Sequence, residues 1–282
     1  MRIMHKTVWL LAAFILGVGV TRAEDAKVQE FGLSVFKLGE ANANDTQAGD
    51  VIDKLAKYLG EKVSGAQFVR RGVRNQPSEA LDLMKQAKDT TAIAIVSPGF
   101  YLKNKDALKL TALAEARRGG FDGEQYTLVG NTKADKYPEG KKIATSLDAD
   151  LDWLNKVVLP APAGAKPVQW VHFDNLADAG YRITDEEDDA PDFILLDKVS
   201  LKVFESDPDL KSLSVGMQSE VLPQDLVVEV DGRLGEKRDA IKKVLLELDK
   251  NDEGKKLGVL LQTATFPAVN EKRLEAAGVK CK

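Results

Sequence analysis

A serine and a tyrosine follow a strand-like segment in the stretch Ser97-Pro98-Gly99-Phe100-Tyr101. The preceding residues, 91–96, are mostly β-branched or alanine, which is typical of a buried strand, and Pro-Gly then ends it in a turn. If this turn lies at an open sheet edge, the hydroxyls of Ser97 and Tyr101 could bind a polar ligand. The alternative is a turn that only redirects the chain, with Tyr101 packed on the core.

Polar side chains also follow three other strand-like segments. Thr145 and Ser146 follow residues 141–144, His172 follows 168–171, and Asp197 follows 193–196. In open parallel sheets, ligands bind outside the carboxyl ends of the strands. The pattern therefore predicts ligand contacts from Ser97, Tyr101, Thr145, Ser146, His172 and Asp197. Thr145, Ser146 and Asp197 could instead cap helices, and a lone histidine is more often structural or on the surface.

Residues for catalysis are scarce. Beyond the first 23 residues the chain has one histidine, His172, and its only cysteine is Cys281, next to the last residue. A Cys/His zinc cluster is therefore excluded, and the sequence has no G-x-S-x-G, Walker A or G-x-G-x-x-G motif. We expect no catalytic residues, no metal and no cofactor, and thus a protein that is not an enzyme.

The first residues are typical of a secretory signal peptide. A basic start with Arg2 and Lys6 precedes the apolar run 7–20, and Thr21 and Ala23 give small residues at an A-x-A-like cleavage site. The apolar run is shorter than the ~20 residues of a membrane span. We predict cleavage near Ala23 and a periplasmic protein, and the alternative is an uncleaved N-terminal anchor.

The charge of the chain excludes some partners. Removing the leader with Arg2, Lys6 and Arg22 leaves 37 basic and 44 acidic residues, a formal net charge of −7. An acidic exported chain is a poor candidate for binding nucleic acid or anionic membranes. The acidic run 185–192 lacks the glycine that a calcium loop needs, so a solvated loop is the simpler interpretation.

Strand-like and helix-like segments alternate along the remaining chain. The first of them, 31–38, 50–62, 66–72, 77–88 and 91–97, read as β-α-β-α-β, with Gly60 expected to stop the first helix. Such an order predicts an α/β fold with a parallel sheet and helices on both faces. About 260 residues are enough for two lobes that each bury a core.

The order of elements resembles that of the periplasmic substrate-binding proteins of phosphate, phosphite and phosphonate ABC transporters, the type II two-lobed binding proteins. The segments that carry the resemblance lie across nearly the whole mature chain: "EALDLMKQAKDTTAIAIVSPGFYL", "LAEARRGGFDGEQYTLVGN", "VHFDNLADAG", "PDFILLDKVSL" and "LKSLSVGMQSEVLPQDLVVEVDGRLGEKRDAIKKVLLELDKNDEGKKL".

This resemblance implies a two-lobed fold with mixed, mostly parallel sheets. Lobe 1 would comprise residues 24–130 and 214–282, and lobe 2 residues 131–213. The chain would cross between the lobes near 129–133 and 212–216. It also implies a monomer that captures a small polar or anionic solute, phosphonate-like or phosphate-like, and delivers it to an ABC permease in the inner membrane.

One segment departs from the family pattern. The family has a Ser/Thr-rich loop with a glycine at a helix N-terminus in lobe 2, where it holds the phosphorus oxyanion. Here "ATSLDAD" keeps Thr145 and Ser146, lacks the glycine, and places Asp148 and Asp150 at the predicted helix start. Carboxylates there satisfy the free N–H groups and repel an anion.

Two alternative functions remain open. One is a solute-sensing or partner-binding periplasmic protein without a transporter, which a gene neighbourhood lacking permease and ATPase would favour. The other is an enzyme on the same architecture, because a fold does not fix a function.

Overall fold

The computed structural model describes residues 28–36, 45–85, 91–147 and 150–281. The predicted signal peptide, residues 1–23, and Asp148 lie outside these ranges. No helix within them has the length and apolar character required to cross a membrane.

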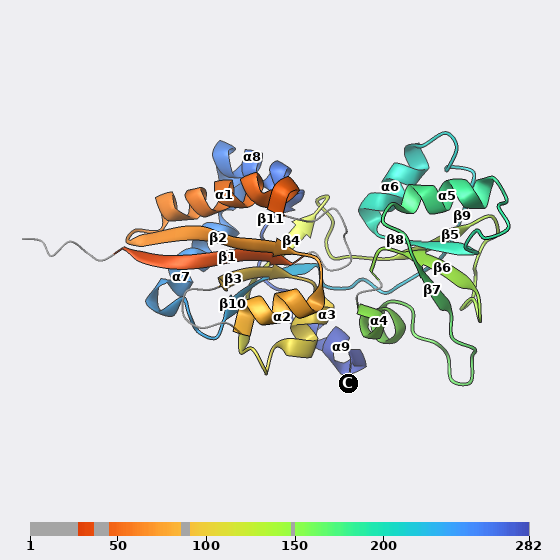
Figure 1. Ribbon diagram of the computed structural model, residues 1–282, viewed down its shortest axis with the longest axis horizontal. Helices are drawn as coiled ribbons and strands as arrows, with labels where there is room; N and C mark the ends of the chain where they lie inside the picture. Colours follow the sequence, from red (N-terminus) through yellow and green to blue (C-terminus); the bar gives the residue numbers. More distant parts are fainter. Residues whose placement is uncertain (1–27, 37–44, 86–90, 148–149, 282) are drawn as a thin grey trace, which may run out of the picture.

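Two sheets lie side by side in separate lobes (Figure 1). Within the described residues, the first has six strands in the order β11-β4-β10-β3-β1-β2. Its strands are β1 (Gln29–Phe36), β2 (Ala66–Arg74), β3 (Thr91–Val96), β4 (Leu110–Arg118), β10 (Asp225–Val230) and β11 (Thr263–Thr265). Strands β1, β2 and β3 are parallel, and β10 runs antiparallel between β3 and β4.

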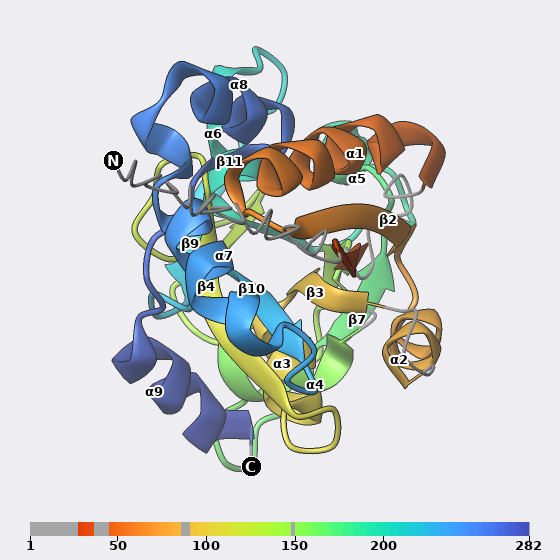
Figure 2. The same ribbon diagram turned by 90° about the vertical axis from the view of Figure 1, so that its left-hand side faces the viewer.

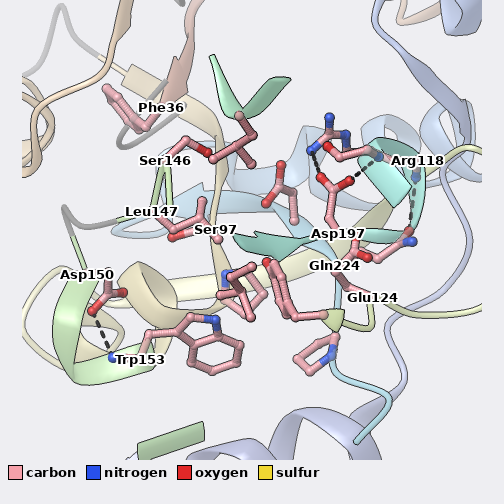
Figure 3. Close-up of a pocket in the computed structure, with 17 residues that line it drawn as sticks. Phe36, Ser97, Arg118, Glu124, Ser146, Leu147, Asp150, Trp153, Asp197 and Gln224 are labelled. Carbon is pink, nitrogen blue, oxygen red and sulfur yellow. Dashed lines mark hydrogen bonds and ion pairs between the residues drawn. The ribbon is translucent and has the colours of Figure 1, made fainter. Parts of the chain in front are cut away.

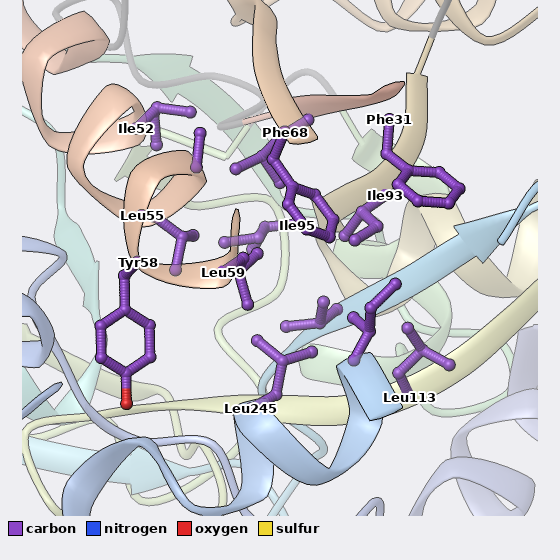
Figure 4. Close-up of a cluster of buried hydrophobic side chains, with 14 of the residues drawn as sticks. Phe31, Ile52, Leu55, Tyr58, Leu59, Phe68, Ile93, Ile95, Leu113 and Leu245 are labelled. Carbon is purple, nitrogen blue, oxygen red and sulfur yellow. The ribbon is translucent and has the colours of Figure 1, made fainter. Parts of the chain in front are cut away.

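Helices cover both faces of the first sheet. They are α1 (Asp45–Lys62), α2 (Pro77–Lys85), α3 (Pro98–Asn104), α7 (Arg238–Leu246), α8 (Asp252–Leu260) and α9 (Glu271–Cys281). Side chains of β3 alternate between the two resulting cores: Ile93 and Ile95 pack with α1, α7 and α8, and Ala94 and Val96 pack with α2, α3 and α9. Figure 4 shows the first of these cores, and Figure 2 shows α1 and α9 on opposite sides of the sheet.

The second lobe repeats this arrangement on a smaller scale. Its five described strands have the order β7-β6-β8-β5-β9, with β5 (Thr127–Gly130), β6 (Lys142–Thr145), β7 (Gln169–His172), β8 (Phe193–Leu196) and β9 (Ser214–Gln218). Its helices are α4 (Leu151–Trp153), which continues as the π-helical turn η2 (Leu154–Val158), α5 (Leu176–Thr184) and α6 (Lys198–Ser206). In β8, Phe193 and Leu195 face the core with α4 and η2, and Ile194 and Leu196 face the core with α5 and α6.

The fold class predicted from the sequence is confirmed: an α/β protein of two lobes, with mixed sheets covered on both faces. In each sheet most strands run in one direction. A strand of opposite direction is inserted next to β3 in the first sheet and next to β8 in the second.

The predicted positions of the two crossings are wrong. Residues 129–133 and 212–216 overlap β5 and β9, which pair with each other inside the second sheet at Val129↔Val215. The chain instead passes between the sheets through 119–126 and 219–224, where Glu124 and Leu222 form an antiparallel bridge. Periodicity shows that a segment is a strand, but it does not show which sheet the strand joins.

Three local predictions also change. The first helix begins at Asp45, before its predicted start at Asp50, and runs past Gly60 to Lys62. The predicted Ser-Pro-Gly turn is the start of helix α3, with Pro98 in its first turn, where a missing N–H costs nothing. The helix predicted after β6 begins at Leu151, with Asp150 as its N-cap rather than in its first turn.

The acidic run 185–192 is a loop in which several carboxylates are paired. Arg182 bonds Asp189 at 3.0 Å, and Lys141 bonds Asp192 at 2.8 Å. Among the described residues, no group of three or more His, Cys, Asp or Glu side chains could hold a metal ion.

Candidate functional site

A cavity of about 90 Å³ lies between the lobes, where the ends of several strands converge (Figure 3). Ser97 and Arg118 come from the carboxyl ends of β3 and β4, and Ser146 and Asp197 from those of β6 and β8. Because β10 is antiparallel, its first residue, Asp225, lies at the same edge of the first sheet. The rule that ligands bind beyond the carboxyl ends of strands therefore places a candidate site in this cavity.

The Ser97 side chain both lines the cavity and caps a helix. Its Oγ accepts a hydrogen bond from the N–H of Phe100 at 3.3 Å. This arrangement leaves the hydroxyl proton of Ser97 able to donate to a ligand. Ser97 can therefore cap the helix and contact a ligand at the same time.

Gly99 of the first lobe lies closely against the second lobe. A Cβ added at Gly99 would lie 2.1 Å from the Asp150 Oδ2 and 3.0 Å from the Trp153 Cβ. Any side chain at position 99 would push against α4 of the second lobe. The φ of Gly99 is not positive, so backbone conformation does not require a glycine here. The closeness of the second lobe does.

Asp197 is held by two groups. One oxygen accepts the N–H of Ser200 at 2.6 Å, as the N-cap of α6, and the other lies 3.5 Å from Nη1 of Arg118 in the first lobe. The two side chains are 17% and 23% exposed. This ion pair links the two walls of the cavity (Figure 3).

Glu124 lies on the same side of the cavity in the first crossing segment, and only 7% of it is exposed. Its Oε1 accepts the N–H groups of Gln125 at 2.9 Å and Lys198 at 3.2 Å. Burial raises the pKa of the Glu124 carboxyl, and the Asp197 carboxylate raises it further. Nearby, Gln224 accepts the backbone N–H of Arg118 at 3.0 Å.

On the opposite side, the Asp150 carboxylate occupies the start of α4. Its Oδ1 accepts the N–H of Trp153 at 3.2 Å, and burial raises the pKa of this carboxyl. A carboxylate of the protein thus bonds a free N–H group at this helix start.

Tyr126 also lines the cavity. Burial raises the pKa of this tyrosine well above its usual value, the carboxylates of Glu124, Asp197 and Asp225 raise it further, and Arg118 lowers it. All three carboxylates line the same cavity as Tyr126.

Of the six residues predicted to contact a ligand, Ser97, Ser146 and Asp197 line this cavity. Tyr101, Thr145 and His172 do not. Thr145 is fully buried and its Oγ1 accepts the N–H of Leu147 at 3.1 Å, so it shapes the turn after β6. His172 ends the edge strand β7, is 42% exposed, and bonds Asp174 at 2.9 Å.

Tyr101 lies on another surface. Because α3 is a helix, the Tyr101 ring packs into the core between the first sheet and α9, and it borders an outer groove formed by α3, α4 and α9. Burial raises the pKa of its hydroxyl. The residue is therefore mainly a core residue.

Five further lining residues were not predicted from the sequence: Arg118, Glu124, Tyr126, Gln224 and Asp225. Arg118 and Asp225 lie at the ends of β4 and β10, so the rule about strand ends could have found them. Glu124, Tyr126 and Gln224 lie in or beside the crossing segments, and those segments become part of the site only when the two lobes meet.

No known family model matches the sequence, and no curated protein matches it. Solved structures do match. The Xanthomonas citri protein XAC2383, solved with ATP, aligns with a TM-score of 0.65 at 11% identity over 90% of this chain and 97% of its own. PhnD1 of Prochlorococcus marinus in complex with methylphosphonate aligns with a TM-score of 0.61 at 13% identity, over 91% and 98%.

A binding-protein component of an ABC phosphonate transporter from Pseudomonas aeruginosa also aligns, with a TM-score of 0.59 at 13% identity over 87% of this chain and 83% of its own. Identities this low establish the fold alone. The chain has the two-lobed fold of type II periplasmic binding proteins, as the sequence resemblance implied.

Proposed function

We infer that the protein captures a small polar solute in the cavity between its lobes. The observation that carries this inference is the set of groups from both lobes that converge there: Ser97 and Arg118 from the first, Ser146 and Asp197 from the second. A solute contacted from both sides favours the closed arrangement and shifts the open–closed equilibrium toward it. Binding of this kind requires no covalent step.

The fold supports a role in uptake. Two of the aligned structures are a component of a phosphonate transporter and a methylphosphonate complex, and the leader-like first residues fit an exported protein. The proposed partner is an ABC permease that recognises the closed form, and the proposed location is the periplasm. The alternative role is sensing of the same solute without a transporter.

Thermal unfolding of the mature protein with a solute library tests this function. The library should contain phosphate, phosphite, methylphosphonate, sulfonates, amino acids, amines and polyols. A solute at 100 times its dissociation constant adds about 2.7 kcal/mol to the free energy of unfolding. If no member raises the melting temperature, the proposed function is wrong.

Two glycine variants then show whether binding uses the cleft between the lobes. Gly99→Ala places a methyl group against Asp150 and Trp153, so it should hinder closure and weaken binding of any solute found. Gly60→Ala in α1 is the matched control, because the nearest atom to its added Cβ, the carbonyl oxygen of Ala66 in β2, lies 3.7 Å away. Equal affinities of the two variants would show that the solute binds elsewhere.

A further inference from the structure

The cavity described above carries an excess of negative charge. Among the described residues that line it, one is basic, Arg118, and four are acidic: Glu124, Asp150, Asp197 and Asp225. Arg118 already pairs with Asp197. With all groups ionised, the lining has a formal charge of −3, so a bound anion would add repulsion, whereas a cation would relieve it.

A more open pocket of about 300 Å³ shares Arg118, Ser146 and Asp197 with the cavity. Its other charged lining residue among those described is Asp174. With its charged groups ionised, this adjoining pocket has a formal charge of −1 from Arg118, Asp174 and Asp197, and an acidic surface attracts cations and repels anions.

Glu124 gives the strongest indication of which chemical class of ligand the cavity binds. Both backbone donors that reach this side chain bond its Oε1, and its second oxygen accepts no hydrogen bond from any residue that the structure describes. The side chain lines the cavity and is only 7% exposed. This second oxygen is therefore left to accept hydrogen bonds from a ligand with N–H groups in the cavity, and such bonds to a carboxylate are among the strong ones.

At the opposite wall, the described start of α4 is already bonded by a carboxylate of the protein. The N–H of Trp153 donates to Asp150, and this carboxylate lies against Gly99 of the first lobe. An oxyanion would have to displace a charged group of the protein at this place.

We propose that the solute of this cavity carries an ammonium group that binds among Glu124, Asp197 and Asp225, beside the Tyr126 hydroxyl. This proposal rests on the function inferred above and names its ligand class. The cavity volume of about 90 Å³ limits the buried part to a few heavy atoms, since a cavity of about 150 Å³ holds benzene. In a zwitterionic solute, the acidic group would lie toward Arg118.

Three probes of nearly equal size and different charge test this ligand class: ethanolamine as the cation, ethylene glycol as the neutral compound and glycolate as the anion. Glycine and methylphosphonate complete the set. We expect ethanolamine or glycine to bind in calorimetry and to raise the melting temperature, and ethylene glycol, glycolate and methylphosphonate to do neither. Binding of glycolate or methylphosphonate, with no binding of any amine in the solute library, would overturn the ammonium proposal and leave the proposed function standing. If no solute of that library binds, both fail.

Proton exchange provides a second readout. An ammonium beside Glu124 lowers the pKa of that carboxyl, so binding near this pKa should release protons, whereas an anion would cause uptake. Calorimetry in two buffers of different ionisation enthalpy measures the sign. Uptake of protons on binding would contradict the proposal.

A pair of variants locates the ammonium. Glu124→Gln keeps the shape and the accepting Oε1 but removes the charge, and it should weaken binding of the amine at least tenfold. Glu236→Gln is the matched control, because the Glu236 side chain is 84% exposed in the first lobe and pairs only with Lys237 at 3.8 Å. Equal affinity of both variants would remove Glu124 from the site.

Discussion

Single residues of the cavity combine a structural and a binding role. Ser97 caps α3, Asp197 caps α6 and Asp150 caps α4, and all three side chains line the same space. This coincidence has a simple cause: in an α/β fold the helix after each strand starts at the carboxyl edge of the sheet, where ligands also bind. A residue that caps such a helix is therefore already placed toward the ligand.

Glu124 supports a prediction about pH. Its pKa is raised in the folded protein by burial and by Asp197, so between the unfolded and the folded pKa the native state holds more protons than the unfolded chain. In that range the stability contributed by this residue falls as pH rises, and above the folded pKa the full destabilisation is present.

We therefore expect Glu124→Gln to be more stable than the original protein at neutral pH without ligand, and the difference to vanish below the unfolded pKa. Urea unfolding at neutral and at acidic pH measures this. A stability difference that is the same at both pH values would contradict it.

At the scale of elements, α9 connects the two lobes in addition to the two crossings. Leu274 packs in a core of the first lobe, and Ala277 packs with Trp153 and Leu154 of the second. Near the end of the helix, Lys156 donates to the carbonyl of Cys281 at 3.2 Å. In Figure 1, α9 lies beside α4, and it contacts η2, the continuation of α4. We therefore expect the helix to restrict how far the lobes separate along this side.

Ala277→Asp tests the contribution of α9. Ala277 is 2% exposed, so a buried carboxylate there should cost at least about 2 kcal/mol of unfolding free energy. Val279→Asp on the same helix is the control, because Val279 is 75% exposed and the change should stay within about 0.5 kcal/mol. Urea unfolding of both variants gives the comparison, and similar losses would show that α9 does not pack as described.

At the scale of the whole molecule, the second lobe is inserted into the first. Its ends meet at the Glu124↔Leu222 bridge, whose two backbone hydrogen bonds are 2.8 and 2.7 Å long. Both of its cores are built almost entirely from its own residues. Such an insertion satisfies the requirements of an independent domain.

We therefore expect a fragment of residues 120–224 to fold by itself, with a cooperative urea transition and native-like circular dichroism. It should be less stable than the whole protein, because Leu102, Ala277 and Cys281 of the first lobe no longer cover its core. As a control, Ile143→Asp, a change at a fully buried position, should abolish the transition. Absence of a cooperative transition in the unaltered fragment would show that the lobes depend on each other.

The sequence by itself determines the class of this fold, because its signals are local. The alternation in 91–96, the helical spacing of Ile241, Val244, Leu245 and Leu248, and the order of strands and helices each depend on neighbouring residues, so they predict the α/β class and three of the cavity residues, Ser97, Ser146 and Asp197.

Only the tertiary structure decides where the lobes meet and what charge they enclose. The pairing of β5 with β9 moves the crossings to 119–126 and 219–224, which brings Glu124, Tyr126 and Gln224 into the cavity. The start of α3 at Pro98 turns Tyr101 into the core, and the edge position of β7 keeps His172 away from the cavity. These outcomes depend on contacts between residues far apart in the chain, and no local pattern encodes such contacts. The sequence therefore locates Ser97-Pro98-Gly99 as one wall of the cleft. The contribution of Glu124 to the acidic lining appears only when the chain is folded.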